Sequence, residues 1–288
     1  MTDAFSLPSG PAAVATLIAT EGTSPKEAGA KMWVDASGAI VGAVTIGGCV
    51  DARVIEESAR VLAEGRAMVL EMSLGDEDAW ALGMTCGGSI EVLIEPVNAA
   101  APADPIARAL RLAQEEMTAG RRVVIVAPLD GRAERLVVFE RGQRAGTLGE
   151  PALDAAAMAA CTAYFERGRS GTSTLEQASG ATRLYFEVHA PPSTLVVFGA
   201  THVAMPLVEM ARVLGLRTVV VDGRERFATR ERFPTADELI VGMPSEIAER
   251  LPLGAHSLVV LLSHDYKYDL PVLRAVLASE AVYVGCLG

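Results

Sequence analysis

The sequence has few of the side chains that structural metal sites and disulfide frameworks need. Its four cysteines, at positions 49, 86, 161 and 286, form no Cys-x-x-Cys pair, and it has only four histidines. This spacing argues against a structural zinc site. The sequence also lacks an apolar run of about 18 residues, which a membrane helix needs, and an N-terminal secretory signal. We therefore expect a soluble protein of a reducing compartment, the cytoplasm, with no membrane partner.

Positive charge is also in short supply. Lysine and arginine number 25 against 36 aspartates and glutamates, which gives a net charge of -11. Nucleic-acid binding depends on basic side chains that neutralise phosphates, so we expect no nucleic-acid partner. An anionic small molecule can still be held locally by helix ends, glycine-rich turns and a few basic residues such as Lys31. With half of its 288 residues apolar, the chain is long enough for two domains with large cores.

Two loops each combine a thiol with a pair of glycines: Gly47-Gly48-Cys49 and Cys86-Gly87-Gly88. Apolar residues recur at helical spacing over residues 51–62, which places Cys49 at or just before a helix N-terminus. There the helix dipole favours an anion and lowers a thiol pKa. Each cysteine has a plainer interpretation as a small buried apolar residue.

The first 190 residues contain a candidate internal repeat. Gly142 and Gly146 have the spacing of Gly38 and Gly42, and Asp154 aligns with Asp51. The first copy comprises a hairpin over 31–34 and 39–46, a helix over 51–62 and a strand over 90–94. The second comprises strands over 122–127 and 136–140, a segment over 153–170 that aligns with residues 50–67 and so contains the equivalent helix, and a strand over 184–188. The second copy has Ala152 in place of Cys49 and a shorter connection in place of the Cys86 loop. The repeat unit therefore does not need the thiols or the glycine pairs to fold, which favours a functional role for them.

Pro191 and Pro192 mark a change of pattern, and we predict domains over 1–190 and 193–288. Beyond them, short apolar strands alternate with helices, which predicts a Rossmann-like, doubly wound parallel sheet. The predicted elements are strands over 194–198, 217–221, 238–241, 257–262 and 281–284, with a helix over 202–214. The fold class is thus α/β, with an N-terminal α+β domain ahead of the Rossmann-like domain.

The first turn of the second domain gives an incomplete nucleotide signal. It reads Gly-Ala-Thr-His-Val-Ala, so Thr201 stands where a dinucleotide fingerprint has its second glycine. Asp222 ends the second strand, where a ribose-binding carboxylate is expected. His202 follows the turn, and we expect it to face the ligand crevice. His264 and Asp265 follow a buried strand at its carboxyl end, where open α/β sheets bind ligands. NAD(P) binding stays open.

Several stretches together carry a resemblance to a known family. These are ATEGTSPKEAGAKMWVDASGAIVGAVTIGGCVDARVIEE, GDEDAWALGMTCGGSIEVLIEP, LVVFGATHVA, VVVDGRERFATRERFP, LLSHDYKYD and AVYVGCLG. In this order they resemble the XdhC/CoxI family of molybdoenzyme accessory proteins. The resemblance implies a maturation factor that binds the molybdenum cofactor, as molybdopterin or its dinucleotide form. Such a factor protects the cofactor or helps to sulfurate it, and delivers it to a molybdenum hydroxylase such as xanthine dehydrogenase or carbon monoxide dehydrogenase.

The resemblance also implies a site. Cys49 and Cys86 would be the chemically active residues and would bind the molybdenum end of the cofactor through their thiols. The expected cofactor-binding residues are Gly47, Gly48, Cys49, Cys86, Gly87, Gly88, Lys31, Gly199, Thr201, His202, Asp222, His264 and Asp265. The partners would be the apo-form of the hydroxylase and a cysteine desulfurase, with a homodimer as the base-rate expectation. Two alternatives stay open, an NAD(P)-dependent oxidoreductase that uses the second domain and a purely structural assembly factor. Whether the chain catalyses a reaction also stays open.

Overall fold

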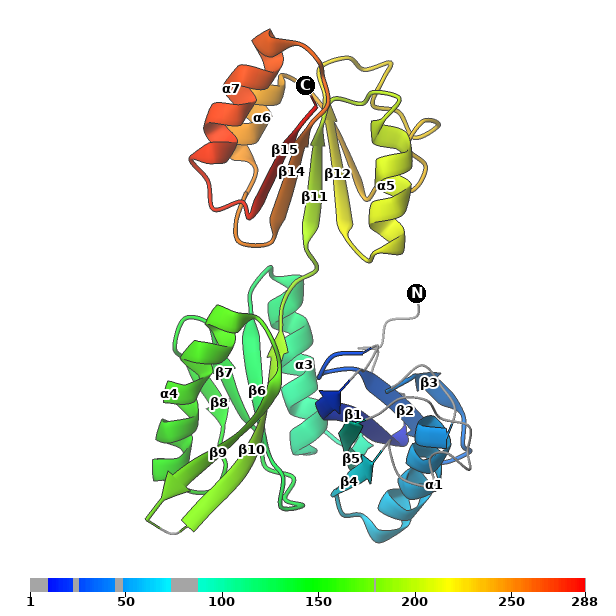
Figure 1. The fold of residues 1–288 in the computed structure, drawn as a ribbon, viewed down its shortest axis with the longest axis vertical. Coiled ribbons are helices and arrows are strands. Elements are labelled where there is room, and N and C mark those ends of the chain that lie inside the picture. Colours follow the sequence, from blue (N-terminus) through cyan, green and yellow to red (C-terminus); the bar gives the residue numbers. More distant parts are fainter. Residues whose placement is uncertain (1–9, 23–25, 45–48, 74–87, 179, 288) are drawn as a thin grey trace. The chain divides into compact units, whose positions relative to one another are not determined.

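A computed structural model describes residues 10–22, 26–44, 49–73, 88–178 and 180–287. Internal contacts divide the chain into unit 1, Met1–Ala190, and unit 2, Pro191–Gly288. Figure 1 shows antiparallel sheets in unit 1 and a sheet covered by helices in unit 2. In the described part of the chain, no helix is long and apolar enough to cross a membrane.

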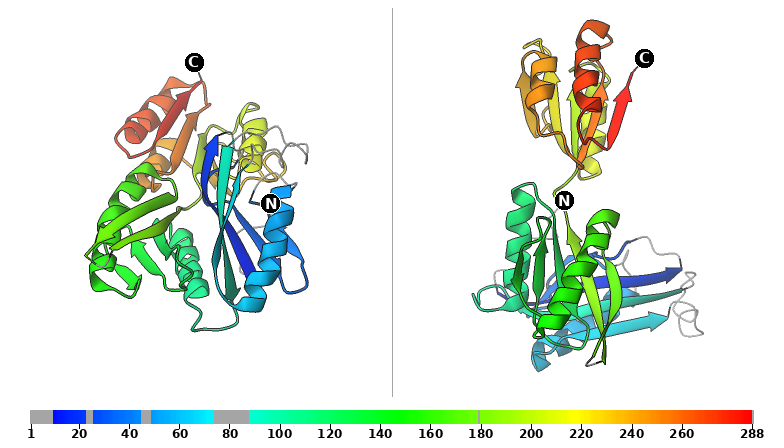
Figure 2. Two further views of the ribbon diagram at one scale, coloured as in Figure 1. Left: turned by 60° about the horizontal axis from the view of Figure 1, so that its bottom comes forward. Right: turned by 90° about the vertical axis from the view of Figure 1, so that its left-hand side faces the viewer.

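The first half of unit 1 is an antiparallel sheet, sheet A, with one helix on its face. The strand order is β3-β2-β1-β5-β4. The strands are β1 (Pro11–Gly22), β2 (Lys31–Asp35), β3 (Ile40–Gly42), β4 (Met68–Ser73) and β5 (Gly88–Asn98), and the helix is α1 (Cys49–Glu64). Figure 2 shows α1 lying along the long strands β1 and β5. The helix predicted over 51–62 is present and extends further at both ends.

The second half of unit 1 forms sheet B, with strand order β8-β7-β6-β10-β9. Its strands are β6 (Val123–Pro128), β7 (Leu136–Phe139), β8 (Arg144–Gly146), β9 (Gly171–Gln177) and β10 (Gly180–His189). Helix α4 (Pro151–Arg167) packs on this sheet, and α3 (Pro105–Thr118) connects the two halves. The sequence pattern missed β9, because this edge strand is rich in threonine and carries little apolar alternation.

The two sheets have the same strand order, so the predicted repeat is present. Equivalent glycines share their backbone conformation, with φ of 84° and 77° at Gly42 and Gly146, and of 128° and 126° at Gly88 and Gly180. Gly42 lies against the carbonyl of Lys31, as Gly146 lies against that of Arg135. Lys31 and Arg135 therefore occupy equivalent positions.

The register of the last strand corrects the sequence alignment by two residues. Ala15 pairs with Ile94 in sheet A, and Val126, the equivalent of Ala15, pairs with Phe186 in sheet B. Ile94 therefore corresponds to Phe186, whereas the alignment of the apolar runs matched it to Val188. A shift of two residues keeps every side chain on its face of the sheet, so the apolar pattern could not reveal it.

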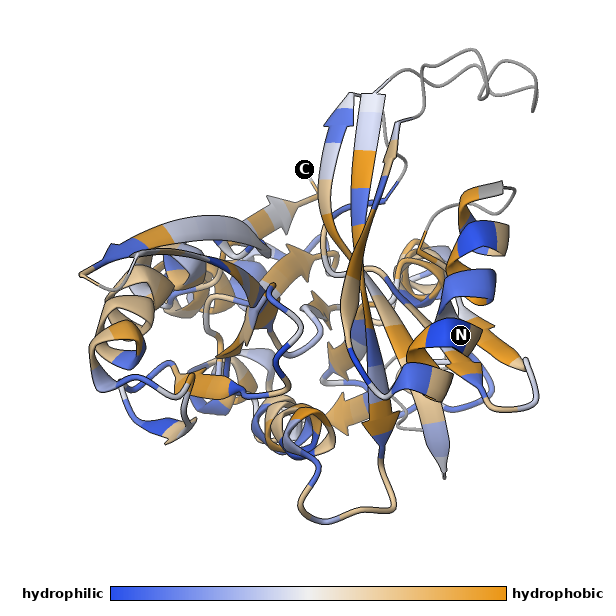
Figure 3. Ribbon diagram, turned by 90° about the horizontal axis from the view of Figure 1, so that it is seen from below, coloured by the Kyte–Doolittle hydropathy of each residue, from blue (hydrophilic) through white to orange (hydrophobic). Residues whose placement is uncertain are grey.

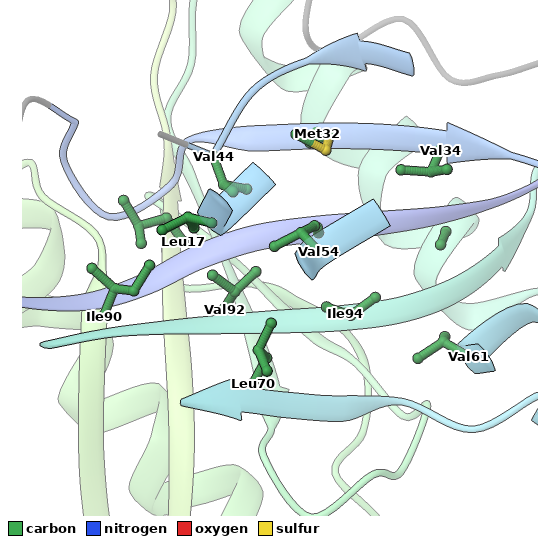
Figure 4. Packing of buried hydrophobic residues seen from close by; sticks show 13 residues of the cluster. Leu17, Met32, Val34, Val44, Val54, Val61, Leu70, Ile90, Val92 and Ile94 are labelled. Carbon is green, nitrogen blue, oxygen red and sulfur yellow. The ribbon is translucent and has the colours of Figure 1, made fainter. Parts of the chain in front are cut away.

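Sheet A is covered on both faces. Figure 4 shows the core under α1, in which Val44, Leu17 and Ile90 lie toward one end and Val61 toward the other. Figure 3 shows both hydrophilic and hydrophobic residues on α1, which lies beside strands that carry many hydrophobic residues. The opposite face packs on α3 and on sheet B, with Ile18 and Leu93 against Ala127 and Tyr185. Unit 1 thus has a further hydrophobic core between its two repeats.

Unit 2 is the predicted Rossmann-like domain. Its parallel sheet has the order β13-β12-β11-β14-β15, with α5 on one face and α6 and α7 on the other (Figure 1). The elements are β11 (Thr194–Phe198), α5 (Ala204–Val213), β12 (Arg217–Asp222), β13 (Glu238–Val241), α6 (Pro244–Arg250), β14 (Ser257–Leu261), α7 (Tyr266–Leu277) and β15 (Tyr283–Cys286). The last strand begins two residues later than predicted. Helix α5 also begins two residues later, because a turn occupies residues 202–203.

Candidate functional site

The described residues that flank the two cysteine loops lie at one end of sheet A. Gly88, which follows the Cys86 loop, pairs with Gly22 at the end of β1. Ser73, which precedes that loop, pairs with Ser89 through the β4–β5 ladder. On the other side, Nζ of Lys26 donates a hydrogen bond to the carbonyl of Ala43 at 2.5 Å. The described residues that flank three connections, 23–25, 45–48 and 74–87, therefore lie near this end of the sheet.

Cys49 is the first residue of α1, as the sequence predicted for the start of a helix. Val44 and Val50 on either side of it belong to the same buried cluster as Leu17 and Ile90. Figure 4 shows Val44 beside Leu17 and Ile90, with Val61, late in α1, at the opposite end of this core, so α1 begins at the end of sheet A where β5 begins. A 16-residue helix leaves its first N–H groups unpaired and carries a partial positive charge at this point.

Other members of the predicted thiol site lie outside the described residues. They are Gly47, Gly48, Cys86 and Gly87. Over the described part of the chain, no group of three or more histidine, cysteine, aspartate or glutamate side chains is placed to hold a metal ion. The roles of Cys49 and Cys86 as ligands of the molybdenum end therefore stay predictions.

Gly88 has a structural role of its own. Its φ of 128° favours glycine, and a Cβ there would overlap the carbonyl oxygen of Glu21 on β1. Its equivalent, Gly180, has the same conformation in the repeat that lacks the cysteines. The expectation that the repeat unit does not need these glycines is therefore wrong for Gly88, because the start of β5 depends on it.

Lys31 forms a buried ion pair inside unit 1. Its ammonium lies 2.9 Å from Oε1 of Glu187 and 2.8 Å from Oγ1 of Thr16, and its side chain is only 5% exposed. The structure thus places Lys31 between the two repeats, where its charge is already neutralised. This differs from the predicted contact with an anionic cofactor, because β2 turns the side chain toward sheet B.

The ion pair of Lys31 has a counterpart that the sequence did not reveal. Arg135, at the equivalent position of the second repeat, pairs with Glu95, and both side chains are buried. The register makes Glu95 the equivalent of Glu187. In each repeat, the cationic side chain therefore forms an ion pair with the glutamate of the other repeat. Burial raises the pKa of Glu187, but Lys31 and then His189 outweigh it and hold this pKa well below its usual range.

Unit 2 contains a pocket of about 420 Å³ at the carboxyl ends of its parallel strands. This size lies within the range of small-molecule sites, and the place is the one at which open α/β sheets bind ligands. Its polar lining comes from the ends of β12 and β14 and from the start of α7. The lining residues are Phe198, Gly199, Asp222, Gly223, Arg224, Gly242, Met243, Pro244, Ser263, Asp265, Tyr268 and Asp269.

Of the predicted nucleotide-binding residues, Gly199 and Asp222 line this pocket. Gly199 has φ of 106°, and a Cβ there would lie 2.8 Å from the backbone nitrogen of Ser263. Asp222 is 4% exposed and accepts hydrogen bonds from the N–H of Ala200 at 2.7 Å and from the Arg224 backbone and guanidinium. Burial raises the pKa of Asp222, but these hydrogen bonds outweigh it and lower the pKa below its usual value. A ribose would have to compete with Arg224 for this carboxylate.

The other predicted residues divide between pocket and surface. Asp265 lines the pocket and caps α7, where it accepts a hydrogen bond from the Lys267 N–H at 3.0 Å. His264 is exposed, with a left-handed φ of 55°, and His202 is exposed in the turn before α5. Thr201 is outside the pocket lining, and its N–H bonds to the carbonyl of Gly199. The structure therefore brings Gly199, Asp222 and Asp265 together and leaves His202, His264 and Thr201 outside.

Sequence reasoning missed four polar side chains of the pocket: Arg224, Ser263, Tyr268 and Asp269. A signal for Arg224 was present in the sequence, because it follows Asp222 by two residues at a strand end. Its guanidinium bonds Asp222 and lies 3.9 Å from the ring centroid of Phe227. Tyr268 and Asp269 lie in the first turn of α7, a helix that the sequence pattern did not reveal.

Comparison with known proteins gives a consistent result. A model of the XdhC and CoxI family matches residues 8–73, and a model of the XdhC Rossmann domain matches residues 195–288. A probable xanthine dehydrogenase subunit of Bacillus subtilis is 24% identical over 279 residues, which cover 96% of this chain and 79% of that protein. The "Uncharacterized protein YqeB" of Escherichia coli is 37% identical over 84 residues, 29% of this chain and 15% of that protein.

A solved structure extends the likeness to the whole fold. The crystal structure described as a xanthine dehydrogenase from Bacillus halodurans matches with a TM-score of 0.77 and 25% identity, over 99% of this chain and 80% of that one. The family matches fall on both units of the chain, in the order that the sequence motifs predicted. The chain belongs to the XdhC and CoxI family.

Proposed function

We propose that this protein is an accessory factor of xanthine dehydrogenase or a related molybdenum hydroxylase, which binds the molybdenum cofactor and delivers it to the apo-enzyme. The observation that carries the proposal is the match of both family models, one on each unit. The Bacillus subtilis relative, which spans nearly the whole chain, is named as part of a probable xanthine dehydrogenase.

The geometry of unit 1 supports a thiol site at one end of sheet A. The connection that contains Cys86 is anchored there by Gly88, and the helix that begins with Cys49 starts at the same end. A thiolate is a soft ligand and suits molybdenum and its exchangeable sulfur, and helix starts and glycine-rich turns suit a phosphate. These residue types would suit a cofactor that has both a phosphate and a metal–sulfur end.

When bound, the cofactor supplies the molybdenum centre that the client enzyme uses. Cys49 and Cys86 would hold that centre while its sulfur is protected or installed. A cysteine desulfurase would supply the sulfur. A second copy of the chain is the simplest oligomeric partner.

Two observations weigh against the alternative, an NAD(P)-dependent oxidoreductase that uses unit 2. The carboxylate expected to bind ribose, Asp222, already accepts hydrogen bonds from Arg224 and from the Ala200 N–H. Thr201, at the position where a dinucleotide needs close backbone approach, carries a β-branched side chain. A purely structural assembly factor would leave the pocket of unit 2 without a purpose.

The proposal is tested by transfer. The protein is purified from a host that makes the cofactor and is mixed with an apo-form molybdenum hydroxylase that free cofactor can activate. We expect the mixture to gain hydroxylase activity and the client to gain molybdenum. The Cys49→Ser, Cys86→Ser double variant should transfer little, and Cys286→Ser, a change at an exposed thiol on β15, should transfer normally. Activation by free cofactor but not by the purified protein would contradict the proposal.

A further inference from the structure

The pocket of unit 2 has an unusual balance of charge for a phosphate-binding Rossmann site. Among the described residues that line it, Arg224 is the one cationic side chain, and its guanidinium is bound to Asp222 through two hydrogen bonds of 2.9 and 2.8 Å. Two further carboxylates, Asp265 and Asp269, line the same pocket. Hydrogen-bond acceptors therefore predominate over free positive charge.

Both of these carboxylates are held in place while keeping acceptor capacity. Oδ1 of Asp265 accepts the Lys267 N–H at 3.0 Å, and Oδ1 of Asp269 accepts the hydroxyl of Ser263 at 2.5 Å. These hydrogen bonds use one oxygen of each carboxylate and fix its orientation at the start of α7. An ionised carboxylate accepts at both of its oxygens and donates at neither. Oδ2 of each group is thus suited to a ligand N–H.

The remaining lining suits a flat ring. Tyr268, 45% exposed, and Met243, 48% exposed, supply aromatic and apolar surface, together with Pro244. Aromatic side chains bind fused heterocycles by stacking. The volume of about 420 Å³ suits a single fused ring.

We infer that this pocket binds a fused ring with a 2-amino-4-oxopyrimidine edge, the edge that guanine and pterins share, through the carboxylate of Asp265. That edge presents two adjacent N–H donors, which match Oδ2 of Asp265 and the remaining lone pair of its Oδ1, since each oxygen of an ionised carboxylate accepts up to two hydrogen bonds. Adenine has a ring nitrogen beside its amino group that is a hydrogen-bond acceptor. This nitrogen and a carboxylate oxygen would repel each other, because neither has a proton to donate. The pocket therefore selects guanine and pterins against adenine. The identification of the ring as a pterin rests on the proposed function, whereas the preference for this edge does not.

The test measures binding of three small probes to the full chain. Guanosine 5′-monophosphate and adenosine 5′-monophosphate are titrated by calorimetry, and 6-hydroxymethylpterin is titrated by its own fluorescence. Asp265→Asn is the test variant, since asparagine caps a helix as well as aspartate does and so preserves α7. Glu249→Gln is the control, because Glu249 is an exposed acid on α6 outside the pocket lining.

We expect the guanine nucleotide and the pterin to bind at least tenfold more tightly than the adenine nucleotide. Asp265→Asn should lose about tenfold or more in affinity for both, as expected for a hydrogen bond to a charged group. Glu249→Gln should bind as the native chain does. Tighter binding of the pterin would identify the ring of the cofactor itself, and tighter binding of the guanine nucleotide would identify a nucleotide source. Equal or tighter adenine binding, absence of binding by any probe, or unchanged binding by Asp265→Asn would each overturn the inference.

This outcome is separable from that of the proposed function. A protein that carries and transfers molybdenum cofactor but binds no probe keeps the proposed function and loses the inference. A protein that binds the guanine nucleotide selectively but neither carries nor transfers cofactor keeps the inference and loses the proposed function.

Discussion

Replacing Glu187 by glutamine is expected to destabilise unit 1 far more than the loss of an ordinary ion pair would. The change removes the negative charge 2.9 Å from the ammonium of Lys31, whose side chain is 5% exposed. Breaking a buried pair from one side leaves an uncompensated charge and costs about 3–5 kcal/mol. The matched change Glu64→Gln breaks the pair with Arg60 on the surface of α1, at 61% and 54% exposure, and should cost less than about 1 kcal/mol.

The assay follows unit 1 selectively. Both tryptophans, Trp33 and Trp80, lie within residues 1–190, so urea unfolding followed by tryptophan fluorescence reports on this unit. Replacing both partners, Lys31→Met with Glu187→Leu, should recover most of the loss, because no unpaired charge stays buried. A cost for Glu187→Gln as small as that for Glu64→Gln, or a double variant worse than the single one, would refute the interpretation of this pair as a buried, mutually dependent contact.

Three further predictions concern stability and reactivity. Gly88→Ala should destabilise unit 1 in the same fluorescence assay, and by more than Gly180→Ala does, because only at Gly88 would the added Cβ overlap backbone of β1; equal costs would contradict the contact. Asp222→Asn should cost about 1.5–3 kcal/mol at neutral pH. Because the pKa of Asp222 is lowered on folding, its contribution is fully present above its ordinary value of 3.8 and is lost as pH falls through the lowered pKa. The native chain and the Asp222→Asn variant should therefore converge in thermal stability as pH falls below 3.8, and a constant gap would contradict this. Burial raises the pKa of the Cys161 thiol to about 12, so native protein at pH 8 should alkylate at the exposed Cys286 and not at Cys161, as peptide mass analysis would show.

The sequence predicted the framework of the fold from local signals. Glycines at turn positions, such as Gly42 and Gly146, have a conformational reason to be glycine, and they revealed the repeat without any structure. The alternation of apolar strands and helices after Pro192 predicted the parallel sheet, because a helix between two strands is the usual connection of parallel neighbours. The register of β10 was wrong because an apolar pattern of period two is unchanged by a shift of two residues.

The candidate site was less predictable, because it depends on contacts between distant positions. Lys31 is a basic residue near a glycine-rich loop in the sequence, and only the pairing of the two repeats shows that Glu187 neutralises it. Asp222 was found by its place at a strand end. Its hydrogen bonds with Arg224 depend on a side-chain conformation that the spacing of residues in the sequence does not determine. Tyr268 was missed because α7 was not located.

The most direct test of the proposed function is metal and pterin analysis of the protein purified from a cofactor-producing host. The native chain is compared with the Cys49→Ser, Cys86→Ser double variant and with Cys286→Ser. The account predicts molybdenum and pterin in near-equal amounts on the native chain and on Cys286→Ser, and their loss from the double variant. Equal cofactor content in all three proteins, or none in the native chain, would contradict it.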